Sequence, residues 1–343
     1  MKATRERAHK VKDTIRSNAR AVFLPAFDTL DFHDVMMPFL NEGGCSVLVG
    51  ETRDEYVNRR MSSDRRVQET RQTFVDAIRE LRQIRRPLIV AVDEELGGIR
   101  RLEALVPTLP SLSDARNLTD ADLEKRCFET ALAAKALGVT MFLSPVADVV
   151  DGKNPWLEGR VLGRDPRSVA RIVSSFVKGV QRAGVTAVTK HFPGFNDLAG
   201  DPALEDVSLV TTREVLLANA LPFRAAIAAG TRAVMAGPAP VVAFDEKNAA
   251  CVSPEIIRLL RTDFAFSGLV VSDDLDAPAT MQGTLLETAV RSLNAGVDLL
   301  LVAGGPHFSE LCEGVADATE RGQVAPERLA DAANRVRAIA AAP

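Results

Sequence analysis

The sequence predicts an α/β fold, a single (β/α)₈ barrel of the TIM type that occupies residues 1–343. Eight short apolar runs alternate with segments of helical periodicity, which is the order of elements in such a barrel. Most runs are continuously apolar, as expected for parallel strands covered on both faces. They begin at Ala21, Cys45, Pro87, Thr140, Val185, Ala233, Gly268 and Val297. A doubly wound open sheet is the alternative, although neither GxGxxG after the first run nor GxxxxGK[ST] occurs.

Helix signals lie between these runs. Thr119 and Asp122 resemble a capping box, and they predict a helix that ends before Gly138. The other predicted helices cover about 166–183, 213–229 and 326–341, and the first two of these end at Gly184 and Gly230.

Composition narrows the class of protein. Hydrophobic residues make up 46% and charged residues 26% of the chain, a soluble globular balance. The formal charge of -4 gives no basic excess for a nucleic-acid partner. Four cysteines without a CxxC pair indicate reduced thiols rather than a disulfide framework or a zinc site. Residues 1–18 lack the apolar region of a secretory signal, and no run is long enough to cross a membrane, so we expect a cytoplasmic protein.

Charged residues stand at the carboxyl ends of several runs, where the loops of a barrel converge. They are Asp93, Asp148, Lys190, His191, Asp273 and Asp274. A charge next to a buried strand is costly unless it is paired or functional. Several such residues together predict a polar active site.

Two of these strand ends carry adjacent charged residues. Neighbours on a strand point to opposite faces, so only one of Lys190 and His191 is expected to aim into the barrel mouth. The same alternation predicts that one of Asp273 and Asp274 faces a ligand while the other supports it. In the alternative interpretation, His191 satisfies a hydrogen bond in the core and the two carboxylates cap a loop.

Five segments together resemble glycoside hydrolase family 3, specifically its compact cytoplasmic β-N-acetylglucosaminidase branch. They are VDEELGGIRRL (92–102), FLSPVADV (142–149), GRVLGRDP (159–166), TKHFPG (189–194) and VVSDDL (270–275). The resemblance covers most of the chain. It implies a retaining exo-glycosidase of the β-N-acetylhexosaminidase type that acts on a small soluble sugar conjugate and needs no cofactor or metal. The sugar in that branch is N-acetylglucosamine linked to muramyl units.

The resemblance also implies roles for the matching residues. Asp273 matches the nucleophile, which attacks the anomeric carbon and forms a glycosyl-enzyme intermediate. Asp93 and Arg101 match groups that hold the distal hydroxyls of the sugar. The groups that contact the ring hydroxyls and the 2-substituent match Arg160, Lys190 and His191.

The loop after KHFPG departs from the family. In this branch it carries H-G-D-T and then D-S-H, whose last His is the general acid/base, but here it reads FNDLAGDPALED (195–206). Counting without a gap, Asp201 takes the place of the Asp that orients that His, and Ala203 takes the place of the His. Because alanine transfers no proton, a loop carboxylate such as Asp201 becomes the predicted catalytic acid. The further candidates are Asp197, Glu205, Asp206 and, after the eighth run, His307.

Three interpretations of this change are open. A loop carboxylate has taken over proton transfer, the substrate has an acidic leaving group such as a phosphate or an aryl group, or hydrolysis has been lost. In the last case the chain is a sugar-binding or regulatory protein. Phosphorolysis, elimination and an aldolase-like Schiff base on Lys190 are further alternatives. The sequence predicts neither the sugar nor the oligomeric state.

Overall fold

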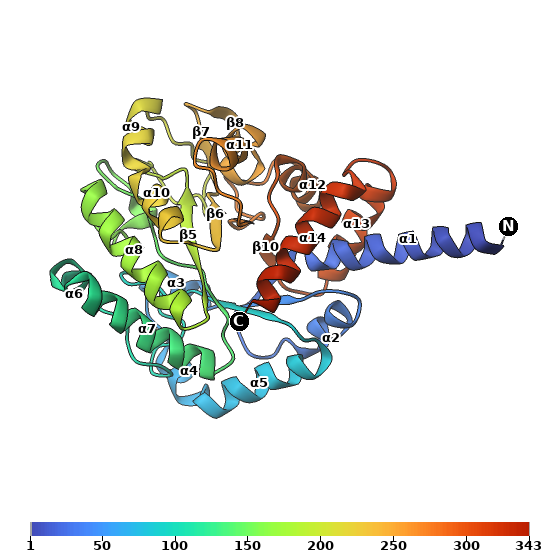
Figure 1. Cartoon of the computed structure of the whole chain (residues 1–343), viewed down its shortest axis with the longest axis horizontal. Coiled ribbons are helices and arrows are strands. Elements are labelled where there is room, and N and C mark those ends of the chain that lie inside the picture. Colours follow the sequence, from blue (N-terminus) through green and yellow to red (C-terminus); the bar gives the residue numbers. More distant parts are fainter. Residues whose placement is uncertain (1, 343) are drawn as a thin grey trace.

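Eight parallel strands form a barrel, and helices surround it (Figure 1). The computed structural model describes residues 2–342. The hydrogen-bonded order is β10-β1-β2-β3-β4-β5-β6-β9, and a bridge between Val271 and Leu299 brings the two ends together. The strands are β1 (Phe23–Phe27), β2 (Ser46–Val49), β3 (Ile89–Val92), β4 (Met141–Phe142), β5 (Thr186–Phe192), β6 (Ala233–Ala236), β9 (Leu269–Ser272) and β10 (Leu300–Ala303). Each lies within one of the predicted runs, so the prediction of a (β/α)₈ barrel is confirmed.

The strands are covered on both faces, as their continuous apolar character predicts. Every residue of β2, β3, β5, β6 and β9 is buried. Apolar side chains inside the barrel and beneath the helices form one continuous core. Charged side chains gather at the carboxyl ends of several strands, as at Asp93, Lys190 and Asp273, and that end of the barrel is where a polar site is built.

The helices follow the strands in chain order. The longer ones are α1 (Lys2–Ala21), α2 (His33–Asn41), α5 (Arg71–Ile84), α7 (Asp120–Ala136), α8 (Pro166–Arg182), α9 (Arg213–Asn219), α10 (Leu221–Ala228), α11 (Pro254–Thr262), α12 (Leu285–Ala295), α13 (Phe308–Glu320) and α14 (Pro326–Ala341). Short helices lie in the loops after β2 and β3, namely α3 (Arg53–Asn58), α4 (Ser63–Gln68) and α6 (Leu112–Asn117). A small antiparallel hairpin, β7 (Pro240–Val241) and β8 (Asp245–Ala249), follows β6.

The helix predictions are confirmed for α8 and α14 and need correction at two other places. The predicted helix over 213–229 is two helices, because Pro222 lacks the N–H that a continuous helix would use there. The capping box at α7 is half formed. The Thr119 hydroxyl accepts from the Asp122 N–H, but the Asp122 carboxylate accepts from that hydroxyl at 2.6 Å instead of from the Thr119 N–H.

Two further features concern the chain as a whole. All four cysteines are free and buried, which confirms the expectation of unpaired thiols. Helix α1 extends away from the barrel and packs against α13 and α14 (Figure 1). Within residues 2–342, neither α1 nor any other helix has the length and apolar character needed to cross a membrane.

A buried ion pair joins α3 and α4 in the loop after β2, and Arg65 Nη2 also donates to the Asp28 carbonyl in the loop after β1 at 2.6 Å. Thr52 and Glu55 form a capping box at the start of α3, and the Glu55 carboxylate accepts from Arg65 of α4 at 2.7–2.9 Å. Burial opposes the charge on Glu55, yet the hydrogen bonds from Arg65, Ser62 and Thr52 hold its pKa below the usual range. The two short helices therefore have a fixed position at the barrel mouth.

We expect Glu55→Gln to lower the free energy of unfolding by about 2 kcal/mol at pH 7, because a buried charge-assisted pair is lost. Chemical denaturation measures this change. The pKa of Glu55 is lowered on folding, so its contribution is present at neutral pH and is lost as the pH falls below about 4. The matched control is Glu320→Gln, which breaks the exposed pair with Lys12 and should change stability by less than about 0.5 kcal/mol. Equal effects from the two variants would contradict the prediction.

Candidate active site

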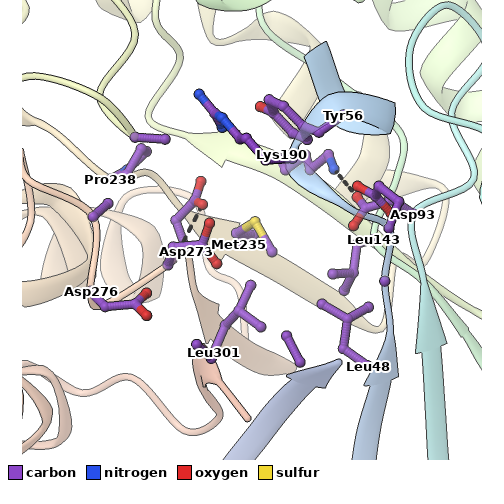
Figure 2. A pocket seen from close by; sticks show the side chains of 18 of the residues that line it. Leu48, Tyr56, Asp93, Leu143, Lys190, Met235, Pro238, Asp273, Asp276 and Leu301 are labelled. Atoms are coloured by element: carbon purple, nitrogen blue, oxygen red, sulfur yellow. Dashed lines mark hydrogen bonds and ion pairs between the residues drawn. The ribbon is translucent and has the colours of Figure 1, made fainter. Parts of the chain in front are cut away.

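A cavity of about 490 Å³ opens at the carboxyl ends of the strands (Figure 2). Its apolar floor includes Leu48, Met235 and Leu301. Its polar walls contain most of the residues selected from the sequence, namely Asp93, Arg160, Lys190, His191 and Asp273. Asp274 also lines the cavity, whereas Arg101 and Asp201 are not among the lining residues. The polar strand ends thus meet at one site.

One buried carboxylate joins two cations in the wall. Glu95 Oε1 lies 2.7 Å from Lys190 Nζ and 2.8 Å from Arg160 Nη2, and Oε2 accepts from Arg160 Nε at 3.1 Å. Lys190 Nζ also lies 2.7 Å from Asp93 Oδ1 (Figure 2). Burial disfavours charge on Glu95, but Arg160 and Lys190 outweigh it and lower its pKa. Likewise burial opposes the charge on Lys190, and Asp93 and Glu95 outweigh it and raise its pKa.

Lys190 and His191 both line the cavity, so the expectation that only one would do so is wrong. Strict alternation holds for a regular strand, but the pairing of β5 with β6 is irregular between Thr189 and Phe192. The two side chains therefore share one side of the chain's path at the barrel mouth.

A buried carboxylate orients His191. Asp148 Oδ2 lies 2.8 Å from His191 Nδ1 and accepts from the His191 N–H at 3.0 Å, while Oδ1 accepts from the Phe195 N–H. The proton of the imidazole is thereby assigned to Nδ1. Nε2 faces the cavity 3.8 Å from Asp273 Oδ2, and Trp156 stacks against the ring with centroids 4.4 Å apart. His191 thus has a structural hydrogen bond and an exposed edge in the site.

Asp273 presents one free carboxylate oxygen. Its N–H donates to Ala236, and its Oδ1 accepts from the Asp274 N–H at 2.9 Å. Its Oδ2 is inaccessible to solvent and has no hydrogen-bond partner among the described residues. Because no donor among the described residues occupies this oxygen, its lone pairs are not engaged by the protein.

The pKa of the neighbouring Asp274 is shifted upward. Burial, together with the charge of Asp273 and that of Asp276, raises the pKa of Asp274 well above its usual value. Both Asp273 and Asp274 line the cavity, so the strict alternation of sides expected for the two residues does not hold there. The chain has left β9 after Ser272, and the two-residue alternation no longer applies.

Arg101 lies behind the cavity wall. Its side chain is buried, with Nε donating to the Gly50 carbonyl at 2.5 Å and Nη2 paired with Glu69 Oε2 at 2.7 Å. Gly50 and Glu51 stand between Arg101 and the cavity, since they line it and Arg101 does not. Arg101 is therefore placed to fix the loop after β2.

The loop that departs from the family contributes Pro202 and Ala203 to the cavity. The Asp201 carboxylate accepts from the Ala203 N–H at 2.9 Å and pairs with Arg53 Nη2 at 3.4 Å. None of the other predicted acids lines the cavity; they are Asp197, Glu205, Asp206 and His307. No side chain that transfers a proton stands at the place of the missing His.

Several polar and aromatic lining residues were not selected from the sequence, among them Glu51, Tyr56 and Trp156. Glu51 directly follows the second predicted strand run, so the rule that identified Asp93 also applied to it. Burial and the charge of Asp93 raise the pKa of Glu51 to about 8. Tyr56 and Trp156 are the only tyrosine and tryptophan of the chain, but they lie in loops where no periodic pattern marks them.

Residues 53–339 match the family model described as the glycosyl hydrolase family 3 N-terminal domain. The chain belongs to glycosyl hydrolase family 3. A β-hexosaminidase of Methylococcus capsulatus is 32% identical over 273 residues, which are 76% of this chain and 80% of that protein. A β-hexosaminidase of Nitrosospira multiformis is 30% identical over 66% of this chain and 67% of its own length.

A solved family 3 structure has the same architecture. The β-N-acetylglucosaminidase of Paenibacillus sp. str. FPU-7 superposes with a TM-score of 0.84 at 27% identity. The match covers 94% of this chain and 61% of that one, so this family 3 chain spans less than two thirds of that protein.

The raised pKa of Glu51 makes its folded form hold a proton that the unfolded chain loses near pH 4.5. Stability should therefore fall as the pH rises from about 4.5 to 8. Glu51→Gln keeps the neutral form at every pH, and its stabilising effect should be on the order of 2 kcal/mol larger at pH 8 than at pH 5. Denaturation at both pH values tests this, with the exposed Glu310→Gln as the control. A pH-independent effect of Glu51→Gln would contradict the raised pKa assigned to Glu51.

Proposed function

We propose that this family 3 chain is a retaining exo-glycosidase of the β-N-acetylhexosaminidase type that acts on a small sugar conjugate. One observation carries the proposal. The free Oδ2 of Asp273 lies in the same cavity as the Asp93–Lys190 pair, with His191 Nε2 3.8 Å away. The similarity to proteins named β-hexosaminidase supports the type of sugar.

Asp273 is the proposed nucleophile. Its Oδ2 forms a bond to the anomeric carbon as the bond from that carbon to the leaving oxygen breaks, and water later hydrolyses the glycosyl-enzyme. The raised pKa of Asp274 supports this role, since two adjacent buried carboxyl groups do not both ionise readily. Attack requires Asp273 as the carboxylate, and the raised pKa of Asp274 favours the proton on that neighbour.

The polar wall is the proposed sugar-binding surface. Asp93 holds the distal hydroxyls, while Arg160, Lys190 and His191 contact the ring hydroxyls and the 2-substituent. Charge-assisted hydrogen bonds to hydroxyls suit this set of donors and acceptors. Arg101 acts on the same surface through the Gly50 carbonyl, which its Nε holds.

The charges of the cavity favour some classes of leaving group over others. The cations among its described lining residues, Arg53, Arg160 and Lys190, are each paired with a carboxylate. A phosphate leaving group and phosphorolysis are therefore less favoured than a neutral alcohol or an aryl group. The raised pKa of Lys190 likewise disfavours a Schiff base, which needs a neutral amine.

Activated 2-fluoro or dinitrophenyl glycosides test the nucleophile. We expect one sugar to be trapped on Asp273, detected by intact mass and peptide mapping. Asp273→Asn should lower kcat/KM by at least about 10³-fold while the protein still binds the sugar. Trp156 provides the binding readout, since it lines the cavity and is the only tryptophan. Sugar trapped at another residue, or turnover by Asp273→Asn, would refute the assignment.

A sugar-binding protein without turnover is the second candidate. The observation in its favour is that Ala203 lines the cavity where the family has its acid/base His. Asp201 stays a predicted acid, but its carboxylate would first have to leave Arg53 and the Ala203 N–H. This candidate predicts quenching of Trp156 and a higher Tm with N-acetylglucosamine, together with no product from any activated glycoside. Measured turnover excludes it.

A further inference from the structure

The proposed glycosidase activity requires a proton for the leaving group, and the loop that supplies it in the family carries alanine here. We propose that the hydroxyl of Tyr56, on α3, donates this proton and later accepts one from the attacking water. The inference rests on the proposed function and names the group that completes its mechanism.

The hydroxyl of Tyr56 has a proton that no described residue accepts. Tyr56 lines the cavity, and its oxygen accepts from Arg160 Nη1 at 3.1 Å and from Trp156 Nε1 at 3.2 Å. These two groups are donors only, so neither takes the phenolic hydrogen. No acceptor for it is found among the described residues, and it is left to bond with whatever occupies the cavity. The side chain thus presents a donor to the substrate.

Tyr56 stands next to the place that the missing His would occupy. Arg53, one helical turn earlier on α3, pairs with Asp201, and Asp201 in turn accepts from the Ala203 N–H. Residues three apart lie on the same face of a helix. The face of α3 that carries Tyr56 therefore borders the loop at Ala203.

The position relative to the nucleophile also fits. Trp156 contacts the Tyr56 hydroxyl through its Nε1 and stacks against His191, whose Nε2 lies 3.8 Å from Asp273. Tyr56 and Asp273 thus stand at the two ends of a wall made of Trp156 and His191. Figure 2 shows Tyr56, which comes from α3, and Asp273, which follows β9, on different sides of the same cavity. The proposed mechanism places the pyranose against this wall, between the two groups.

The proton balance closes without any further reactant. Asp273 bonds to the anomeric carbon, the leaving oxygen takes the phenolic proton, and Tyr56 becomes a phenolate. A water then gives its proton to the phenolate while its oxygen attacks the anomeric carbon and releases Asp273. The phenolate keeps the hydrogen bonds from Arg160 and Trp156, and the guanidinium groups of Arg53 and Arg59 lie 5.0 and 4.5 Å from the ring centroid.

The resting state has the required proton. Burial raises the pKa of Tyr56, and Arg160 and Arg59 only partly oppose this effect. The hydroxyl is therefore protonated before catalysis, as a general acid must be.

Tyr56→Phe removes the proton and keeps the ring between the arginines. For an alkyl glycoside we expect kcat/KM to fall by about 10²-fold or more, the usual contribution of general acid catalysis. For a 2,4-dinitrophenyl glycoside, whose leaving group needs no proton, kcat/KM should fall by less than about 3-fold, because general acid catalysis contributes little to that chemical step. Azide should raise kcat of the variant on that substrate and yield the β-glycosyl azide, because azide needs no base. Azide should have no such effect on the wild type.

Two further variants separate proton transfer from structural support. Ala203→His, introduced into Tyr56→Phe, should restore at least part of the activity on alkyl glycosides. Asp201→Asn alone should not reproduce the dependence on the leaving group, whereas it would do so if Asp201 were the acid. Glu310→Gln, exposed and outside the cavity, serves as the unchanged control.

The outcomes distinguish the two proposals. A uniform loss in Tyr56→Phe across all leaving groups, without glycosyl azide, overturns the role of Tyr56 and leaves Asp273 untouched. The same holds if Asp201→Asn alone shows the dependence on the leaving group. A wild type that neither turns over activated glycosides nor is trapped at Asp273 overturns both.

Discussion

The site depends on one buried ion cluster, in which Glu95 holds Arg160 and Lys190. These residues come from the loop after β3, the loop after β4 and β5, so the cluster fixes three parts of the barrel mouth relative to one another. Each charge is satisfied by another, which offsets the cost of taking it out of water. Removal of Glu95 would leave two buried cations facing each other. The positions of Asp93 and Tyr56 follow, since Lys190 holds the first and Arg160 the second.

Because the cations are neutralised within the wall, the cavity offers a ligand hydrogen bonds more than net charge. Lys190 has three N–H groups, and Asp93 and Glu95 occupy two of them. The pKa of Glu51 is raised to about 8 and that of Asp274 is also raised, which favours the protonated forms that can donate hydrogen bonds. Such a surface suits a neutral polyol better than an anion. This agrees with a glycone defined by its hydroxyl groups.

The strands and the place of the site could be predicted because each rests on a local pattern. A buried parallel strand must be apolar throughout, and a charge at its end is then conspicuous, as at Asp93 or Asp273. The rest depends on tertiary contacts that no periodicity records. The alternation rule fails at Lys190 and His191 where the ladder is irregular, and Tyr56 belongs to the site only because α3 folds over the mouth. The break at Pro222, by contrast, was readable from the sequence.

The proposed replacement of the family's loop His by Tyr56 as the general acid affects which substrates the enzyme would favour. An imidazole on a loop ionises near neutral pH, whereas the Tyr56 phenol has a raised pKa and is a weaker acid. Proton transfer from it is favourable only late in the cleavage of the bond, when the leaving oxygen has gained most of its charge. The fixed position on α3, held by Glu55 and Arg65, avoids the entropy of ordering a loop around the substrate. In such an enzyme the acid is weaker than the family's imidazole but is held in a fixed position. The enzyme therefore favours conjugates whose leaving groups are more acidic than simple alcohols.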